Sequence, residues 1–174
     1  MRIIALITLI FAFKCYAAEY PACDIHDSRS VPLYTNGVKA TIEASIKGAP
    51  CYKAQLEIKV LVSGKPSYSY KAPFNSHVAI NWAALTEQDA KNYLESIYLA
   101  YNFINCNELL PAKLEEGDPS GYNYNSLLVP LETYNHFKAS NCKVFIHQIH
   151  YEASRAIVFP VGTKRSLKVS EFGL

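Results

Sequence analysis

Apolar and polar residues alternate between Val38 and Phe74, and this pattern constrains the fold more than any other feature of the chain. The alternation runs through three stretches, 38–47, 52–62 and 68–74, with aliphatic residues or tyrosine at nearly every second position. Successive side chains of a β-strand point to opposite faces, so a period of two is typical of strands with one buried face. The segment therefore predicts consecutive strands.

Turn-forming residues separate these strands. Asn36-Gly37 is a strong hairpin signal, because both residue types tolerate positive φ, and it follows a short run at 31–35. Glycine and proline recur at 48–50 and 63–66, between the later strands. Pro32 suits an edge strand, since proline removes a backbone donor. We expect an antiparallel β-meander of four strands after an irregular segment at 18–30.

The pattern becomes helical after Thr86, a good N-cap residue with Asp89 three positions on. Apolar residues then recur at helical spacing, which predicts one long helix over 87–105 with an apolar stripe that covers the sheet. Glycine and proline predict a long loop from 109 to 125. The remaining expected elements are a short strand at 78–82, a short helix at 130–139 beginning with Pro130, and strands at 143–151, 155–161 and 165–170.

These elements predict an α+β fold, in which an antiparallel β-meander packs against one long helix and further strands follow toward the C-terminus. No segment after residue 17 has the composition of a linker between domains. We therefore expect a single α+β domain over residues 18–174.

The first seventeen residues have the layout of a secretory signal peptide. Arg2 gives a positive start, an apolar run extends from Ile3 to Phe13, and Ala17 is a small residue at the expected cleavage position. The run is shorter than the roughly 20 residues that a membrane span needs. We expect residues 1–17 to be removed, which makes the protein periplasmic or secreted, with no transmembrane segment in the mature chain.

Four cysteines remain after the leader: Cys23, Cys51, Cys106 and Cys142. An even number in an oxidising compartment indicates two disulfides. A zinc site is disfavoured, because no two of these cysteines have the close spacing of zinc ligands. The meander brings residue 23 near the turn before Cys51, so we favour Cys23–Cys51 and Cys106–Cys142 over the other two connectivities.

Charge restricts the classes of partner. Without Arg2 and Lys14, the chain has fifteen basic and fifteen acidic residues. A neutral chain without a long basic run has few clustered cations for phosphate groups, so we expect neither nucleic acid binding nor adhesion to anionic membranes. A lipid anchor on Cys15 is also not expected, because Lys14 occupies the position where a bacterial lipobox has a small residue.

Histidine and carboxylate pairs are the candidates for catalysis. His147 and His150 lie three apart in a segment that predicts a strand, so their rings point to opposite faces and cannot share a metal ion. His150 and Glu152 fall on one face, which fits a general base with an orienting acid or, more simply, a solvated polar pair. Asp24, His26 and Asp27 lack the spacing of a calcium or zinc site. We expect no catalytic residue, metal site or cofactor.

Tyrosine is the one compositional excess. Tyr68 and Tyr70 share a strand face and are expected in the core or at its rim, whereas other tyrosines lie in the long loop beside an acidic cluster. Tyrosine-rich loops make adaptable contact surfaces. The candidate binding residues are therefore Glu115, Glu116, Asp118, Tyr122 and Tyr124.

The favoured function is that of a small exported, disulfide-stabilised module, similar in kind to an inhibitor or immunity protein, which binds another protein through the loop at 111–125 and a neighbouring sheet edge. A secreted hydrolase that uses His150 with Glu152 is the first alternative. The second is a component of a surface assembly that pairs through an exposed strand.

Overall fold

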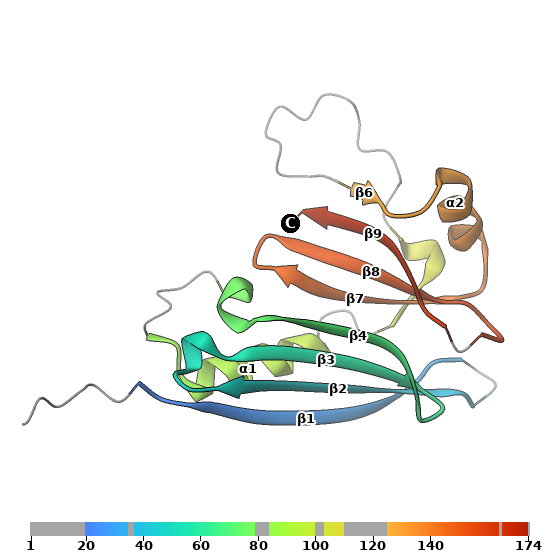
Figure 1. Cartoon of the computed structure of the whole chain (residues 1–174). Helices are drawn as coiled ribbons and strands as arrows, with labels where there is room; N and C mark the ends of the chain where they lie inside the picture. Colours follow the sequence, from blue (N-terminus) through green and yellow to red (C-terminus); the bar gives the residue numbers. More distant parts are fainter. Residues whose placement is uncertain are drawn as a thin grey trace, which may run out of the picture.

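The computed structural model describes residues 20–34, 37–78, 84–99, 103–109, 125–163 and 165–173. Within these residues, two antiparallel sheets and two α-helices form a mixed fold (Figure 1). The predicted α+β class is confirmed.

The N-terminal half forms a four-stranded antiparallel meander in the order β1-β2-β3-β4. The strands are β1 (Cys23–Pro32), β2 (Lys39–Gly48), β3 (Gln55–Val62) and β4 (Lys65–Pro73), with short 3-10 helices η1 (Cys51–Lys53) and η2 (Phe74–His77) beside them. Ile42 and Ile58 on the inner face are fully buried, whereas Glu43 and Lys59 on the outer face are partly exposed. The alternation in the sequence thus corresponds to one buried and one solvated face.

The first strand is longer and earlier than predicted. Residues 18–30 are not irregular as a whole, because β1 begins at Cys23 and ends at Pro32. Asp27 and Arg29 occupy inward positions opposite the buried Ala44 and Ile42. These two charged residues interrupt the apolar alternation in the sequence of β1, so the strand cannot be recognised from its pattern. They are accommodated by Tyr98, whose hydroxyl donates to the Asp27 carbonyl at 3.0 Å and whose ring lies 4.4 Å from the Arg29 guanidinium.

The helix α1 (Glu87–Leu99) begins as predicted, with Thr86 as its cap: the Asp89 amide donates to Thr86 Oγ1 at 3.2 Å. The prediction that this helix continues to residue 105 is wrong for residues 104 and 105, whereas residues 100–102 lie outside the described residues. Ile104 and Asn105 form the short strand β5, which pairs with Val144 and Lys143. Strand pairing and the cysteine at 106 hold this segment against the second sheet, and they override its helical spacing.

The second sheet has five strands in the order β5-β7-β8-β9-β6. Its longer strands are β7 (Lys143–His150), β8 (Ala153–Phe159) and β9 (Leu167–Gly173), at the edge lies β6 (Asn125–Leu127), and the associated helices are α2 (Leu131–Ala139) and η4 (Cys106–Glu108). Pro130 is the N-cap of α2 rather than its first residue. Six of the seven residues of β8 are buried, because both faces of this sheet are covered.

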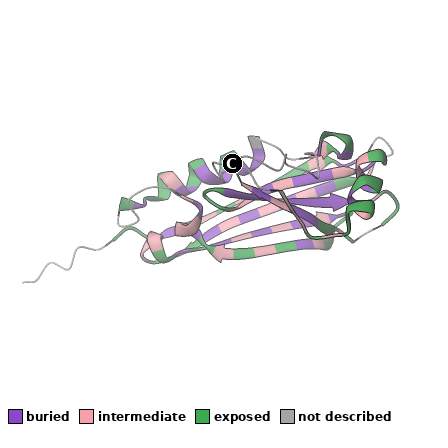
Figure 2. Ribbon diagram, turned by 90° about the horizontal axis from the view of Figure 1, so that it is seen from above, coloured by how far each residue is buried: buried purple, intermediate pink, exposed green. Residues whose placement is uncertain are grey.

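Two apolar cores result. Buried positions alternate with partly buried or exposed ones along the strands (Figure 2). The first core joins the inner face of β1–β4 and α1 to Phe145, Ile157 and Phe159 of the second sheet. The second core lies between the other face of that sheet and α2, with Tyr134 and Val158 among its fully buried members. The second sheet is therefore the middle layer of the molecule.

Both predicted disulfides are confirmed. Cys23 pairs with Cys51 at a Cα–Cα distance of 4.8 Å, and Cys106 pairs with Cys142 at 5.3 Å. The first bridge joins the start of β1 to η1, and the second joins η4 to the residue before β7. Cys106 does not directly follow a helix, because the predicted helix does not continue to residue 105; it is the first residue of η4.

Several predicted segments lie outside the described residues: the leader at 1–17, most of the strand at 78–82 and most of the loop at 109–125. None of the helices in the described ranges combines the length and apolar character that crossing a bilayer requires.

Candidate functional site

The predicted binding residues cannot be placed. Glu115, Glu116, Asp118, Tyr122 and Tyr124 all lie in the segment 110–124, which is outside the described residues. Their role in binding stays a prediction.

The histidine of the predicted hydrolase lies at the tip of the β7–β8 hairpin. His150 is exposed, and its Nδ1 atom accepts from the backbone amide of Glu152 at 3.5 Å. The Glu152 carboxylate instead acts on the neighbouring Tyr151 hydroxyl and raises the pKa of that phenol. In this arrangement the carboxylate does not orient the imidazole as a general base requires.

The acidic cluster near the N-terminus is divided between two faces of β1. Asp24 and His26 alternate with Asp27, which faces the side of the sheet that carries α1. Within the described ranges, no three histidine, cysteine or carboxylate side chains gather in a way that could hold a metal ion.

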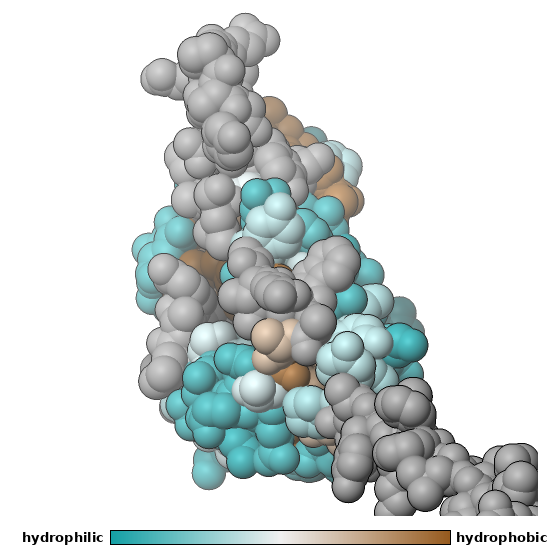
Figure 3. All heavy atoms as spheres, turned by 90° about the vertical axis from the view of Figure 1, so that its left-hand side faces the viewer, coloured by the Kyte–Doolittle hydropathy of each residue, from teal (hydrophilic) through white to brown (hydrophobic). Residues whose placement is uncertain are grey.

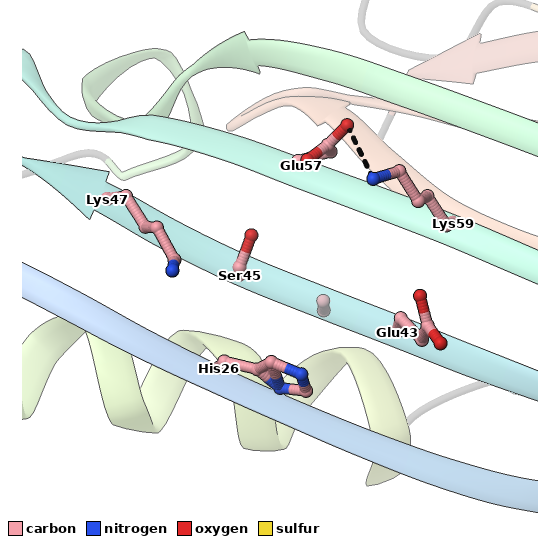
Figure 4. A pocket seen from close by; sticks show the side chains of 7 residues that line it. His26, Glu43, Ser45, Lys47, Glu57 and Lys59 are labelled. Carbon is pink, nitrogen blue, oxygen red and sulfur yellow. Dashed lines mark ion pairs between the residues drawn. The ribbon is translucent and has the colours of Figure 1, made fainter.

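A shallow hollow of about 310 Å³ lies on the outer face of the first sheet (Figure 4). The helix α1 lies behind the sheet in this view, so the hollow opens on the face that α1 does not cover. It is lined by His26 of β1, by Glu43, Ala44, Ser45 and Lys47 of β2, and by Glu57 and Lys59 of β3.

The register of the strands explains how these residues meet. His26 lies opposite Ser45, and Ser45 lies opposite Glu57, so three polar side chains form a row across three strands. Glu43 lies opposite Lys59 in the neighbouring row. The sequence shows each residue as a solvated position of its strand, but only the pairing register brings them into one hollow.

Carboxylates accompany the cations of this face. Lys59 Nζ lies 3.1 Å from Glu57, and Lys47 Nζ lies 3.3 Å from Asp24 just outside the hollow. An exposed ion pair is worth about 0–1 kcal/mol, so these pairs contribute little to stability. Their effect is to leave the surface with charges of both signs.

The row His26, Ser45 and Glu57 does not have the order of a catalytic triad. In a triad the imidazole lies between the hydroxyl and the carboxylate, whereas here Ser45 occupies the middle strand. The hollow is also open to solvent. Its geometry fits contact with a polar surface better than nucleophilic catalysis.

A buried tyrosine–histidine cluster lies between the two sheets and is the most unusual chemistry of the interior. His147 is only 4 % exposed; its Nε2 atom lies 2.7 Å from the Tyr68 hydroxyl and its Nδ1 atom lies 2.7 Å from the Gln148 carbonyl. Since a carbonyl only accepts, Nδ1 carries the proton and Nε2 accepts from Tyr68. Burial lowers the pKa of His147 to about 4.

His77 completes the cluster from η2. Its Nδ1 atom lies 2.8 Å from the Tyr93 hydroxyl, and its Nε2 atom lies 3.3 Å from the hydroxyl of Tyr70. Tyr70 donates to the Ile149 carbonyl at 2.9 Å, so its oxygen remains free to accept from His77 Nε2. Burial, with a smaller contribution from His150, lowers the pKa of His77 to about 4.

An ion pair borders the cluster on β8 and β9. Arg155 Nε donates to Glu171 Oε1 at 2.8 Å, Nη2 donates to the same oxygen, and the guanidinium also hydrogen bonds Tyr68. Both ring nitrogens of each histidine are occupied when the rings are neutral. The cluster therefore joins the two sheets and presents no unoccupied base to a substrate.

No family model, curated protein or solved structure matches this chain.

Proposed function

We propose that the protein is a small exported module, stabilised by two disulfides, that binds another protein through the outer face of the sheet β1–β4. The hollow around Ser45 lies at the centre of this contact surface. The loop at 111–125, with Tyr122 and Tyr124, is a second contact segment of the same proposal.

One observation carries the proposal: the outer face of the meander is an extended polar surface on strands of eight to ten residues. The inner face of the same strands is fixed by the first core and by the Cys23–Cys51 bridge. A surface on rigid elements loses little conformational entropy when a partner binds.

The chemistry of the hollow favours a protein over other ligands. Nucleic acid is bound by cations that are free to displace counterions, whereas Lys47 and Lys59 lie in ion pairs with carboxylates. Among the described residues, no phenylalanine, tyrosine or tryptophan lines the hollow, and its lining is mostly polar, unlike the mostly apolar pockets of small ligands. A protein surface with charges of both signs complements it best.

Two observations support the exported part of the proposal. Two disulfides form and persist in oxidising compartments. The signal-peptide layout of residues 1–17 leads to the same compartment.

The test is affinity capture with residues 18–174, a fragment that contains every described element. A protein captured from the envelope or medium of the producing cells is identified, and its dissociation constant is measured with purified components. We expect E43K/E57K to weaken binding at least tenfold. The control E87K/E95K makes the same charge change on exposed positions of α1 and is expected to have no effect.

Deletion of residues 117–124 tests the loop in the same assay and is expected to weaken binding further. If the captured partner binds E43K/E57K and the deletion variant as tightly as the unmodified chain, both contact surfaces are wrong. If no protein is captured by the folded chain, the proposed function is wrong.

A further inference from the structure

Three turns that are far apart in sequence meet at one end of the molecule, on the right in Figure 1. They are the β1–β2 turn, the β3–β4 turn and the β8–β9 turn. The Ser63 amide donates to the Lys39 carbonyl at 3.1 Å, which joins the first two turns. Tyr34 donates to the Phe159 carbonyl, and Ser166 Oγ donates to the Ser67 carbonyl at 2.7 Å, which join both to the third.

These turns carry exposed cations without neighbouring acids. Lys39, Lys65, Arg165 and Lys168 are exposed, and none of them forms an ion pair with a described carboxylate. The sequence has no aspartate or glutamate in the segments 30–41, 60–68 and 158–169, which contain the three turns. The three turn segments thus carry positive charge without the carboxylates that accompany the cations on the outer face of the first sheet.

Two aliphatic side chains lie among these cations. Val161, in the β8–β9 turn, is 54 % exposed, and Leu167, at the start of β9, is 45 % exposed. We define the basic pole as these two residues with Lys39, Lys65, Arg165 and Lys168. At the opposite end of the molecule, the described atoms are mostly hydrophilic and apolar ones occur in small separate groups (Figure 3).

We propose that the basic pole docks on an anionic membrane surface, with its cations against lipid phosphates and with Val161 and Leu167 in the interfacial layer. Cations near an anionic bilayer contribute about 1 kcal/mol each, and apolar side chains add to this when they enter the headgroup boundary. Turn tips from three hairpins project toward the partner, and a bilayer accommodates such tips more readily than a rigid protein surface does.

This inference revises the expectation drawn from net charge. The neutral chain has no basic run, but the fold collects cations from positions up to 129 residues apart, Lys39 and Lys168, into one surface. The proposal does not use the residues that line the hollow or the loop at 111–125. Failure of one proposal therefore leaves the other standing.

Vesicle flotation with residues 18–174 tests the pole, and the leader is omitted because its own apolar run would enter the bilayer. Vesicles of phosphatidylcholine alone are compared with vesicles that contain roughly a third phosphatidylglycerol, in low salt. We expect partition into the anionic vesicles at least tenfold stronger than into the neutral ones. K65E/R165E should reduce this partition at least tenfold.

K53E/K71E is the matched control, because it makes the same charge change at exposed lysines outside the three turns, and it should reduce partition less than twofold. V161S/L167S should reduce partition severalfold, and this effect should remain in high salt. All of the substituted side chains are exposed, so we expect every variant to fold. Far-UV circular dichroism of each variant checks this.

Poly-L-glutamate in place of vesicles distinguishes a lipid surface from an acidic protein. If K65E/R165E weakens binding to this polymer as much as binding to vesicles while V161S/L167S leaves vesicle binding unchanged, the pole recognises acidic protein and the membrane proposal is overturned. Equal partition into neutral and anionic vesicles, or an equal effect of K53E/K71E, would also overturn it.

Discussion

His77 and His147 are held as neutral rings between the two sheets, and the direction of each hydrogen bond depends on that state. The Tyr93 hydroxyl donates to His77, and the Tyr68 hydroxyl donates to His147. Protonation of either ring would place an imidazole N–H donor against the hydroxyl that donates to it. The cluster resembles a buried polar network that is stable only when every member has its partner.

Acid should therefore destabilise the protein through these histidines. The pKa of each ring is about 4 in the folded chain, below the value of about 6.5 in an unfolded chain. Between these pH values the unfolded state binds more protons than the folded state. The contribution of the two neutral rings to the free energy of unfolding is therefore complete above pH 6.5 and decreases as the pH falls toward 4. The loss is at most about 3 kcal/mol for each ring.

Urea unfolding at a series of pH values measures this dependence, and NMR titration of the imidazole signals assigns it. The exposed His26 serves as the control, because His26→Gln should leave the profile unchanged. Titration of His77 and His147 near pH 6.5 in the folded protein would contradict the account.

Removal of one phenolic hydroxyl tests the completeness of the network. Tyr68→Phe leaves His147 Nε2 buried without a donor and removes one acceptor of Arg155. We expect a loss of about 1–3 kcal/mol in the free energy of unfolding. Tyr20→Phe, at a tyrosine that is 48 % exposed, should change it by less than about 0.5 kcal/mol. Similar values for the two variants would mean that the hydroxyl of Tyr68 does not contribute.

At the scale of the elements, the turn between β2 and η1 depends on a glycine. A Cβ atom at Gly48 would lie 2.6 Å from the Ala54 Cα atom, closer than two such atoms approach, and the obstacle is backbone. We expect Gly48→Ala to lower the free energy of unfolding by about 1–3 kcal/mol, because the turn must shift. Gly37→Ala is the control, because Gly37 also has a positive φ but no atom lies within 4 Å of the added Cβ. Its loss in the free energy of unfolding measures the effect of positive φ without a clash. An equal loss at both sites in thermal or urea unfolding would rule out the clash.

The greater part of the meander was predictable because β2, β3 and most of β4 keep their alternation and because glycine or proline marks the turns. The pairing of the four cysteines followed from the same strand order. The start of β1 was not predictable, since Asp27 and Arg29 occupy inward positions and depend on Tyr98, which is distant in sequence. The end of α1 was misjudged for a related reason: Ile104 fits the helical spacing, but its pairing with Val144 is a long-range contact.

The candidate surfaces were less predictable than the fold. The residues of the hollow and of the basic pole are ordinary polar positions in the sequence, and only strand register and turn placement gather them. The alternating pattern did place Tyr68 and Tyr70 on one face, and both hydroxyls contact buried histidines.

At the scale of the whole molecule, β8 couples the two cores. Ile157 belongs to the first core and Val158 to the second, and both are fully buried. We expect Ile157→Ala to cost about 2–5 kcal/mol and Val158→Ala somewhat less. Because one strand carries both residues, each variant should still unfold in a single transition, with far-UV and near-UV circular dichroism coinciding. Separate transitions would show that the cores are independent.

We propose an exported chain in which two disulfide bridges hold a scaffold for binding. Mass spectrometry of the protein isolated from its producing cells and digested without reductant is the sharpest test of export and of the bridges. We expect an N-terminus at Ala18 and peptides linked through Cys23–Cys51 and Cys106–Cys142. A chain that retains Met1 and has four free thiols would contradict it.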